Sequence, residues 1–178
     1  MPVDMKRMIA ATFTQMAKEK HIDKITVKDL VEQCGISRQT FYYHFQDMLD
    51  VMEWTIRQAL QCAVQDSLQA ETPQKAIERF IRPAITHGPQ LVQLLSSQRR
   101  DQVVGIFVDA MRSSIGQMLY SRQPNRAVKP QDLDVALTFY AYGITGVIFE
   151  NCKKPNIQVE YLAEQIYRLF SAGWKESQ

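Results

Sequence analysis

The stretch Thr26–Phe45, TVKDLVEQCGISRQTFYYHF, decides the fold. Thr26 is a good N-cap for a short helix over Val27–Cys34, and Gly35 suits the left-handed stop that follows. Ser37 then caps a second helix that runs to about His44. The apolar residues of this stretch and of the preceding segment are expected to close a small core: Val27, Leu30, Val31, Ile36, Phe41 and Phe45 with Ile9, Phe13 and Ile25. The pattern predicts two short helices that cross steeply at a glycine turn.

The exposed face of the second helix carries side chains that suit nucleic acid. Arg38, Gln39 and Thr40 occupy its first turn, where recognition helices touch base edges. Arg can bind guanine O6 and N7 together, Gln can bind adenine N6 and N7, and a Thr methyl can pack on a thymine methyl. Donors for phosphate oxygens, and one further cation, stand around them: Lys28, Ser37, Tyr42, Tyr43 and His44. An amphipathic helix without a partner is the alternative, but the two caps, glycine turn and polar first turn together favour DNA binding.

Composition places the chain among ordinary globular proteins, with 46% hydrophobic and 22% charged residues in 178. Residues 1–46 hold seven Lys/Arg and five Asp/Glu, and the remainder holds fourteen of each, so the whole net charge of +2 lies at the amino end. That asymmetry favours a nucleic-acid partner for this end. The three cysteines form no CxxC pair, which predicts free thiols in a reducing cytoplasm.

Motifs of catalysis are missing from the sequence. It has no glycine-rich phosphate loop, no HExxH, no GxSxG and no Cys/His pair at metal-ligand spacing. The sequence therefore predicts neither an enzyme nor a metal site, and no cofactor.

Apolar residues repeat with a helical period along nearly the whole chain, so an all-α fold of about nine helices is expected. Residues 1–46 form the predicted three-helix DNA-binding domain, and residues 47–178 form a helical domain for effector binding and dimerisation. A fourth helix of about 24 residues should begin at Asp47, and Pro83 should kink the fifth. Residues 123–130 read as a polar loop. The last helix should place Val159, Ile166, Phe170 and Trp174 on one face.

The longest apolar run, Val135–Phe149, is about fifteen residues, whereas a bilayer span needs roughly 20. We expect a cytoplasmic protein in which this helix is covered on all sides. A second copy of the chain is the natural cover, and Gly143 and Gly146 would let helices approach closely. With Ile166 and Phe170 of the last helix they predict a four-helix bundle about a twofold axis. A lone domain that wraps the helix by itself is the alternative.

Aromatic, methionine and histidine side chains in the second domain are candidates for an effector cavity that takes a small, partly apolar ligand. Ordinary core packing explains each of them as well. They are Phe80, His87, Phe107, Met111, Met118, Tyr140 and Tyr142.

The amino-terminal stretch resembles the TetR family of regulators, whose usual run is T-V-x-D-[IL]-x-x-x-x-G-[VI]-S-x-x-[TS]-[FL]-Y-x-[HY]-F. The family implies a homodimeric transcriptional regulator, most often a repressor, that binds a palindromic operator in double-stranded DNA. A small-molecule effector controls that binding. Met48 is a departure, because the family often has a phosphate-contacting lysine there. By this resemblance Thr26, Ser37, Tyr42 and His44 contact phosphates, and Arg38, Gln39 and Thr40 read bases.

The segment Phe139–Phe149, FYAYGITGVIF, is similar to the eighth helix of a subgroup that includes regulators of dihydroxyacetone kinase operons. That resemblance keeps a second function open: an activator or architectural factor controlled by a protein partner.

Overall fold

The computed structural model describes residues 4–122 and 130–173. Within them the regular elements are nine α-helices and one 3-10 turn, η1 (Ile22–Lys24), without a strand. The expected all-α fold of about nine helices is confirmed. Most of the loop expected over 123–130, and Trp174, lie outside the described residues. The helices are α1 (Met5–Glu19), α2 (Val27–Cys34), α3 (Arg38–His44), α4 (Met48–Leu68), α5 (Pro73–Thr86), α6 (Gly88–Leu95), α7 (Arg100–Arg122), α8 (Pro130–Asn151) and α9 (Val159–Gly173).

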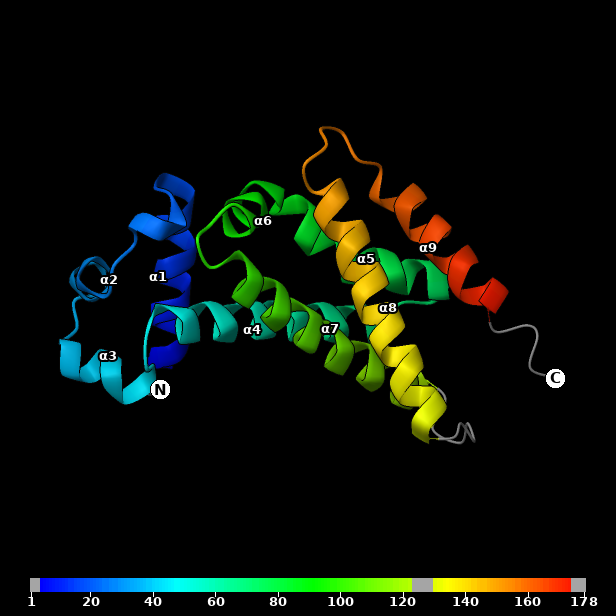
Figure 1. Cartoon of the computed structure of the whole chain (residues 1–178), viewed down its shortest axis with the longest axis horizontal. Helices are drawn as coiled ribbons and strands as arrows, with labels where there is room; N and C mark the ends of the chain where they lie inside the picture. The colour runs from blue at the N-terminus through cyan, green and yellow to red at the C-terminus, as the bar shows by residue number, and fades with distance from the viewer. Residues whose placement is uncertain (1–3, 123–129, 174–178) are drawn as a thin grey trace.

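Helices α1 to α3 form a small head at one end of the molecule, and α4 leads from it into the larger body (Figure 1). The head closes around Ile9, Phe13, Leu30, Phe41 and Phe45, each no more than 4% exposed. These side chains come from all three helices, so burial of their apolar surface fixes the angle between α2 and α3.

Helix α4 begins behind an Asp47 cap, whose carboxylate accepts the Asp50 N–H at 2.9 Å. It has 21 residues rather than the expected 24, because the chain turns at Gln69 before Thr72 caps α5. At 1.5 Å per residue its length is about 31 Å. Since α4 packs on both α5 and α7, it joins the head to the centre of the body.

Helix α5 continues through Pro83 to Thr86, so the proline does not end it. A proline in a helix removes one backbone hydrogen bond, and the apolar face of α5 compensates by burying Phe80 and Ile81. The chain then passes through Gly88 into α6. A Cβ on Gly88 would lie 2.6 Å from the carbonyl oxygen of Cys152, so only glycine fits this crossing of α6 and the end of α8.

Ion pairs tie α9 to α5. The Arg82 guanidinium contacts Glu78 at 2.5 Å within α5 and Glu160 of α9 at 2.6 Å. Lys75 also contacts Glu78, at 2.7 Å. Hydrogen bonds from Lys75 and then Arg82 lower the pKa of Glu78, which keeps this buried carboxylate charged.

Helix α8 packs on α7 through a face that includes Ala141 and Ile148, both at most 1% exposed. Its opposite face is uncovered in the single chain. Over Gln131–Asn151 the helix is long and apolar enough to pass as a membrane span, contrary to the expectation from the shorter run. Length and composition alone carry little weight, because core helices of soluble proteins pass the same test.

Candidate nucleic-acid interface

A capping box holds the start of α2. The Thr26 N–H donates to Asp29 Oδ2 at 3.0 Å, and the Asp29 N–H donates to Thr26 Oγ1 at 3.2 Å. The Lys20 ammonium also donates to Asp29 Oδ2, at 2.9 Å. The Lys20 hydrogen bond, followed by those of Thr26, lowers the pKa of Asp29 to about 2. The carboxylate is therefore charged at neutral pH and joins the end of α1 to α2.

The turn between α2 and α3 has the predicted geometry. Gly35 has a φ of +66°, the left-handed region that favours glycine. The Ile36 N–H then donates to the Val31 carbonyl at 3.1 Å, which closes the helix end. Ser37 caps α3 by accepting the Thr40 N–H at 3.0 Å. Local sequence thus sets the path into α3.

Two aromatic side chains anchor the inner face of α3. Phe41 is fully buried and Phe45 is 1% exposed, and Phe45 makes an edge contact with Trp54 of α4 at 6.2 Å between ring centroids. The Lys6 ammonium of α1 lies 5.0 Å from the Phe45 ring centroid, a cation–π distance. With one face fixed on α1 and α4, the other face of α3 must point to solvent.

The outward face of α3 carries the predicted contact residues. Arg38 and Gln39 are exposed, and neither side chain has a partner in the described part of the chain. Tyr42 is 57% exposed and Tyr43 is 85% exposed. They follow Arg38 and Gln39 by four residues each, so the four side chains share one helix face. Five hydrogen-bond donors on Arg and an amide on Gln are therefore free to meet base edges.

The side chains of the remaining predicted contact residues already make contacts within the chain. The Thr40 and Ser37 hydroxyls are 2.9 Å apart in a hydrogen bond, so Thr40 offers its methyl group more readily than its hydroxyl. His44 is half-buried and meets the Tyr43 ring edge-on at 5.0 Å. Lys28 is exposed on α2, 3.9 Å from Glu32, and Thr26 lies within the capping box.

Met48 and Lys6 determine where positive charge lies near the junction of α3 and α4. Met48, at the position where the resembled family often has a lysine, is 7% exposed and belongs to the core. The cation near this junction is instead Lys6, held over the Phe45 ring. Sequence reasoning did not single out Lys6, because nothing in the motif spacing links a residue of α1 to the end of α3.

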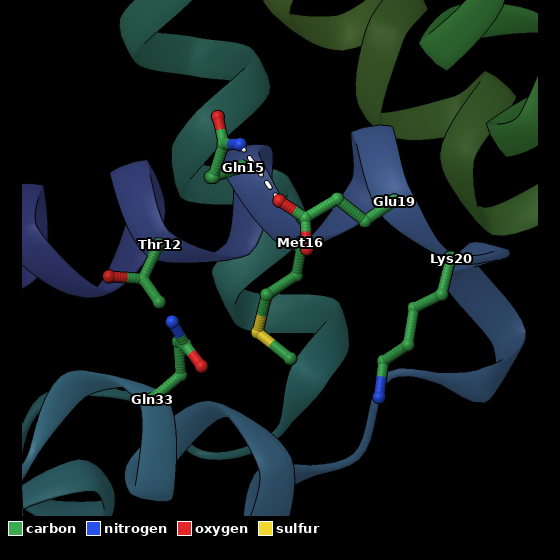
Figure 2. Close-up of a pocket in the computed structure, with 6 residues that line it drawn as sticks. All are labelled: Thr12, Gln15, Met16, Glu19, Lys20 and Gln33. Carbon is green, nitrogen blue, oxygen red and sulfur yellow. Dashed lines mark hydrogen bonds between the residues drawn. The ribbon is translucent and has the colours of Figure 1, made fainter.

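A hollow of about 280 Å³ lies between α1 and α2 in the head (Figure 2). Two of its polar side chains already have partners, since Gln15 donates to Glu19 at 3.0 Å and Lys20 donates to Asp29 at 2.9 Å. Met16 reaches into the space between the two helices (Figure 2). None of the predicted DNA-contacting residues lines this hollow.

The expected effector residues do not form one exposed cluster. Phe80, Phe107 and Met111 are 4%, 6% and 0% exposed and lie in the continuous core. His87 is exposed at the junction of α5 and α6. Tyr140 is half-buried and stacks on Phe170 of α9, with ring centroids 4.1 Å apart. Of the two other candidates, Met118 is half-buried and Tyr142 is exposed.

The expected dimer residues divide into two groups. Gly143 and Gly146 are exposed on α8, and an added Cβ at either would meet no atom within 4 Å. Ile166 is 4% exposed and faces the protomer's own core, and Phe170 is engaged by Tyr140. Side chains outside the expected dimer set are more exposed on α8 and α9. They are Val135, Phe139, Tyr142, Tyr161 and Leu169, each at least 62% exposed.

Metal ligation is not supported by the described residues, since no group of three His, Cys, Asp or Glu within 4–122 and 130–173 is placed to hold an ion.

The head, with a capped helix pair and a polar outer face on the second helix, defines a helix-turn-helix DNA-binding protein. Two family models cover most of the chain: "Bacterial regulatory proteins, tetR family" over residues 9–53, and "Transcriptional regulator C-terminal region", of the same family, over residues 71–172. The chain belongs to the TetR family. It is a DNA-binding transcriptional regulator and not an enzyme.

Solved structures of other proteins share this fold. The dihydroxyacetone kinase operon activator DhaS is 16% identical with a TM-score of 0.67, and the match covers 96% of each chain. Lin0861 from Listeria innocua is 17% identical with a TM-score of 0.71, over 97% of this chain and 94% of that one. The fatty acid degradation regulator FadR from Bacillus halodurans is 11% identical with a TM-score of 0.56, over 94% and 98%. No curated protein sequence matches the chain.

Proposed function

We propose that the protein is a cytoplasmic, homodimeric repressor that binds a palindromic operator and is released by a small-molecule effector. Residues 1–46 bind the DNA, and residues 47–178 dimerise and receive the effector. The observation that carries sequence-specific binding is the outward face of α3, where Arg38 and Gln39 are exposed without side-chain partners above a buried Phe41. Arg and Gln are the side chains that make bidentate contacts with guanine and adenine.

Dimerisation is supported by the uncovered face of α8. Val135, Phe139 and Tyr142 are exposed at spacings of four and three residues, with Gly143 and Gly146 beside them. Monomeric proteins rarely leave a contiguous apolar stripe of this kind in water. A second copy that places its own α8 and α9 against the stripe would pair two heads for two half-sites on one face of the duplex.

Control by a protein partner, with activation in place of repression, is the second candidate. It is favoured by the burial of Phe80, Phe107 and Met111, which leaves these positions packed rather than open to a ligand. The name of DhaS describes that structural neighbour as an operon activator. Transcription from a selected promoter with the purified protein alone distinguishes the two candidates. Repression without any added protein supports the first, and activation that requires an added protein supports the second.

Selection of bound sequences from random DNA is the test of specific binding. The parent protein should enrich an inverted repeat whose half-site centres lie near one helical turn or a multiple apart. Arg38→Ala and Gln39→Ala should each relax the preference at one base position of every half-site, at a cost of about 1–3 kcal/mol per base pair read. Enrichment of unrelated sequences by the parent would contradict sequence-specific regulation.

A further inference from the structure

A second hollow, of about 350 Å³, lies in the body where α6, the start of α7 and the last turns of α8 meet. Figure 1 shows the carboxyl end of α8 beside α6. Val92 and Leu95 of α6 and Phe149 of α8 give it an apolar lining, and Gly146, next to the proposed dimer stripe on α8, also lines it. The volume falls within the range of small-molecule sites, which begins near 300 Å³. The hollow can therefore hold a compact ligand with an apolar body.

Charged groups at this hollow favour an anion. Arg100 and Lys153 line it together with one carboxylate, Glu150. Glu150 is neutralised by Lys153 at 3.0 Å. Arg100 contacts Asp101 at 3.4 Å, but the Asp101 side chain is 96% exposed, so this ion pair is weak. The Arg100 guanidinium retains donors in a fork that matches a carboxylate, sulfonate or phosphate.

We propose that this hollow is the effector site and that it takes a small amphipathic anion. The apolar body packs on Val92, Leu95 and Phe149, and the anionic group binds Arg100 with Lys153 beside it. The proposal rests on the proposed regulated DNA binding and names the site and ligand class for it. It also places the effector outside the packed core around Phe107.

Two contacts connect this hollow to other parts of the molecule. The Gln98 N–H, two residues before Arg100, donates to Asp23 Oδ2 of η1 in the head at 3.2 Å. Phe149 also meets Phe107 of α7 edge-on, with ring centroids 5.1 Å apart. A ligand that draws Arg100 inward displaces the connection between α6 and α7, and with it the contact to Asp23. The effector shifts operator affinity only as far as it prefers one of the two arrangements.

A pair of fluorescent probes tests the ligand class. 1-Anilinonaphthalene-8-sulfonate has an aromatic body and one anionic group, and N-phenyl-1-naphthylamine has a similar body without the charge. We expect the combined Arg100→Glu and Lys153→Glu variant to bind the sulfonate at least tenfold more weakly than the parent and to bind the neutral amine as the parent does. The matched control is Arg99→Glu with Lys154→Glu. It changes the net charge equally at neighbouring exposed residues outside the lining, and should bind both probes normally.

Several outcomes would overturn the assignment. Equal sulfonate binding by the two double variants would show that the probe binds elsewhere or senses only net charge. Loss of both probes from the Arg100 and Lys153 variant, at an unchanged melting temperature, would show that these cations do not select the anion. If charge reversal unfolds the protein, Arg100→Gln with Lys153→Gln removes the same charges and should show the same selective loss.

The connection to the head is tested with a selected operator duplex. Saturating sulfonate should weaken operator binding by the parent at least fivefold, and operator should weaken sulfonate binding by the same factor. Asp23→Ala should bind the sulfonate normally and show a reduced mutual effect. Failure of the parent to bind any operator without probe contradicts the proposed function. Normal operator binding that the sulfonate leaves unchanged contradicts this effector site alone.

Discussion

Replacement of Phe139 by alanine separates dimerisation from folding. The Phe139 side chain is 70% exposed on α8, so its removal costs the protomer little core packing. An aromatic side chain buries roughly 150–250 Å², which leaves about 140 Å² of Phe139 for a partner. At ~25 cal/mol per Å² this is about 3.5 kcal/mol per protomer and about 7 kcal/mol for two symmetric copies, as an upper bound. Each 1.4 kcal/mol is about tenfold in affinity, so a loss of about 3 kcal/mol, less than half of this bound, raises the dimer Kd ~100-fold.

Sedimentation velocity from nanomolar to micromolar concentration measures this change. The Phe139→Ala protein should be monomeric where the parent is dimeric, with an unchanged circular dichroism spectrum and weaker operator binding. Tyr43→Ala is the matched control, because Tyr43 is an 85% exposed aromatic residue on α3. That variant should remain dimeric and lose only DNA affinity. A Phe139→Ala dimer as tight as the parent, or a monomeric parent at micromolar concentration, would refute the role of the α8 face.

Three further predictions concern Gly88, Asp29 and Tyr42. Gly88→Ala should lower the free energy of unfolding by about 1–3 kcal/mol in urea titrations, because the new methyl meets the Cys152 carbonyl, whereas Gly105→Ala, with nothing within 4 Å, should not destabilise. The pKa of Asp29 is lowered to about 2 in the folded state. Its contribution to the stability of the fold is therefore complete above its ordinary pKa of 3.8 and is lost as the pH falls through 2. The melting-temperature difference between the parent and Asp29→Asn should therefore shrink below pH 4, and a constant difference down to pH 2 would contradict this role. Tyr42→Phe should weaken binding to specific and random duplexes by similar factors in gel-shift titrations, and a loss confined to the operator would assign Tyr42 to base reading.

The head could be predicted in detail from sequence because local residues determine it. Thr26 and Ser37 cap their helices by bonding backbone three residues ahead, and Gly35 turns the chain by its own backbone conformation. None of these features depends on distant packing. The same reasoning gave the exposed face of α3, since Phe41 and Phe45 mark the opposite face.

The body was harder to predict because its faces depend on contacts between distant segments. Ile166 has the spacing of an interface residue, but α9 packs on α5 and turns Ile166 inward. The periodicity of α7 predicts that Phe107 faces inward, yet it does not say whether a cavity remains beside it. The hollow lined by Val92 and Phe149 joins helices that are far apart in sequence, and no local pattern indicates it.

The three free thiols differ in accessibility: Cys62 is exposed on α4, Cys34 is half-buried and Cys152 is buried. Burial also raises the pKa of Cys152, which lowers the amount of reactive thiolate there. A maleimide spin label should therefore modify Cys62 first in the natural sequence. In a dimer, two such labels would report the separation of the two α4 helices by electron–electron coupling, so operator and effector could be added in turn while the distance is read, without an engineered cysteine.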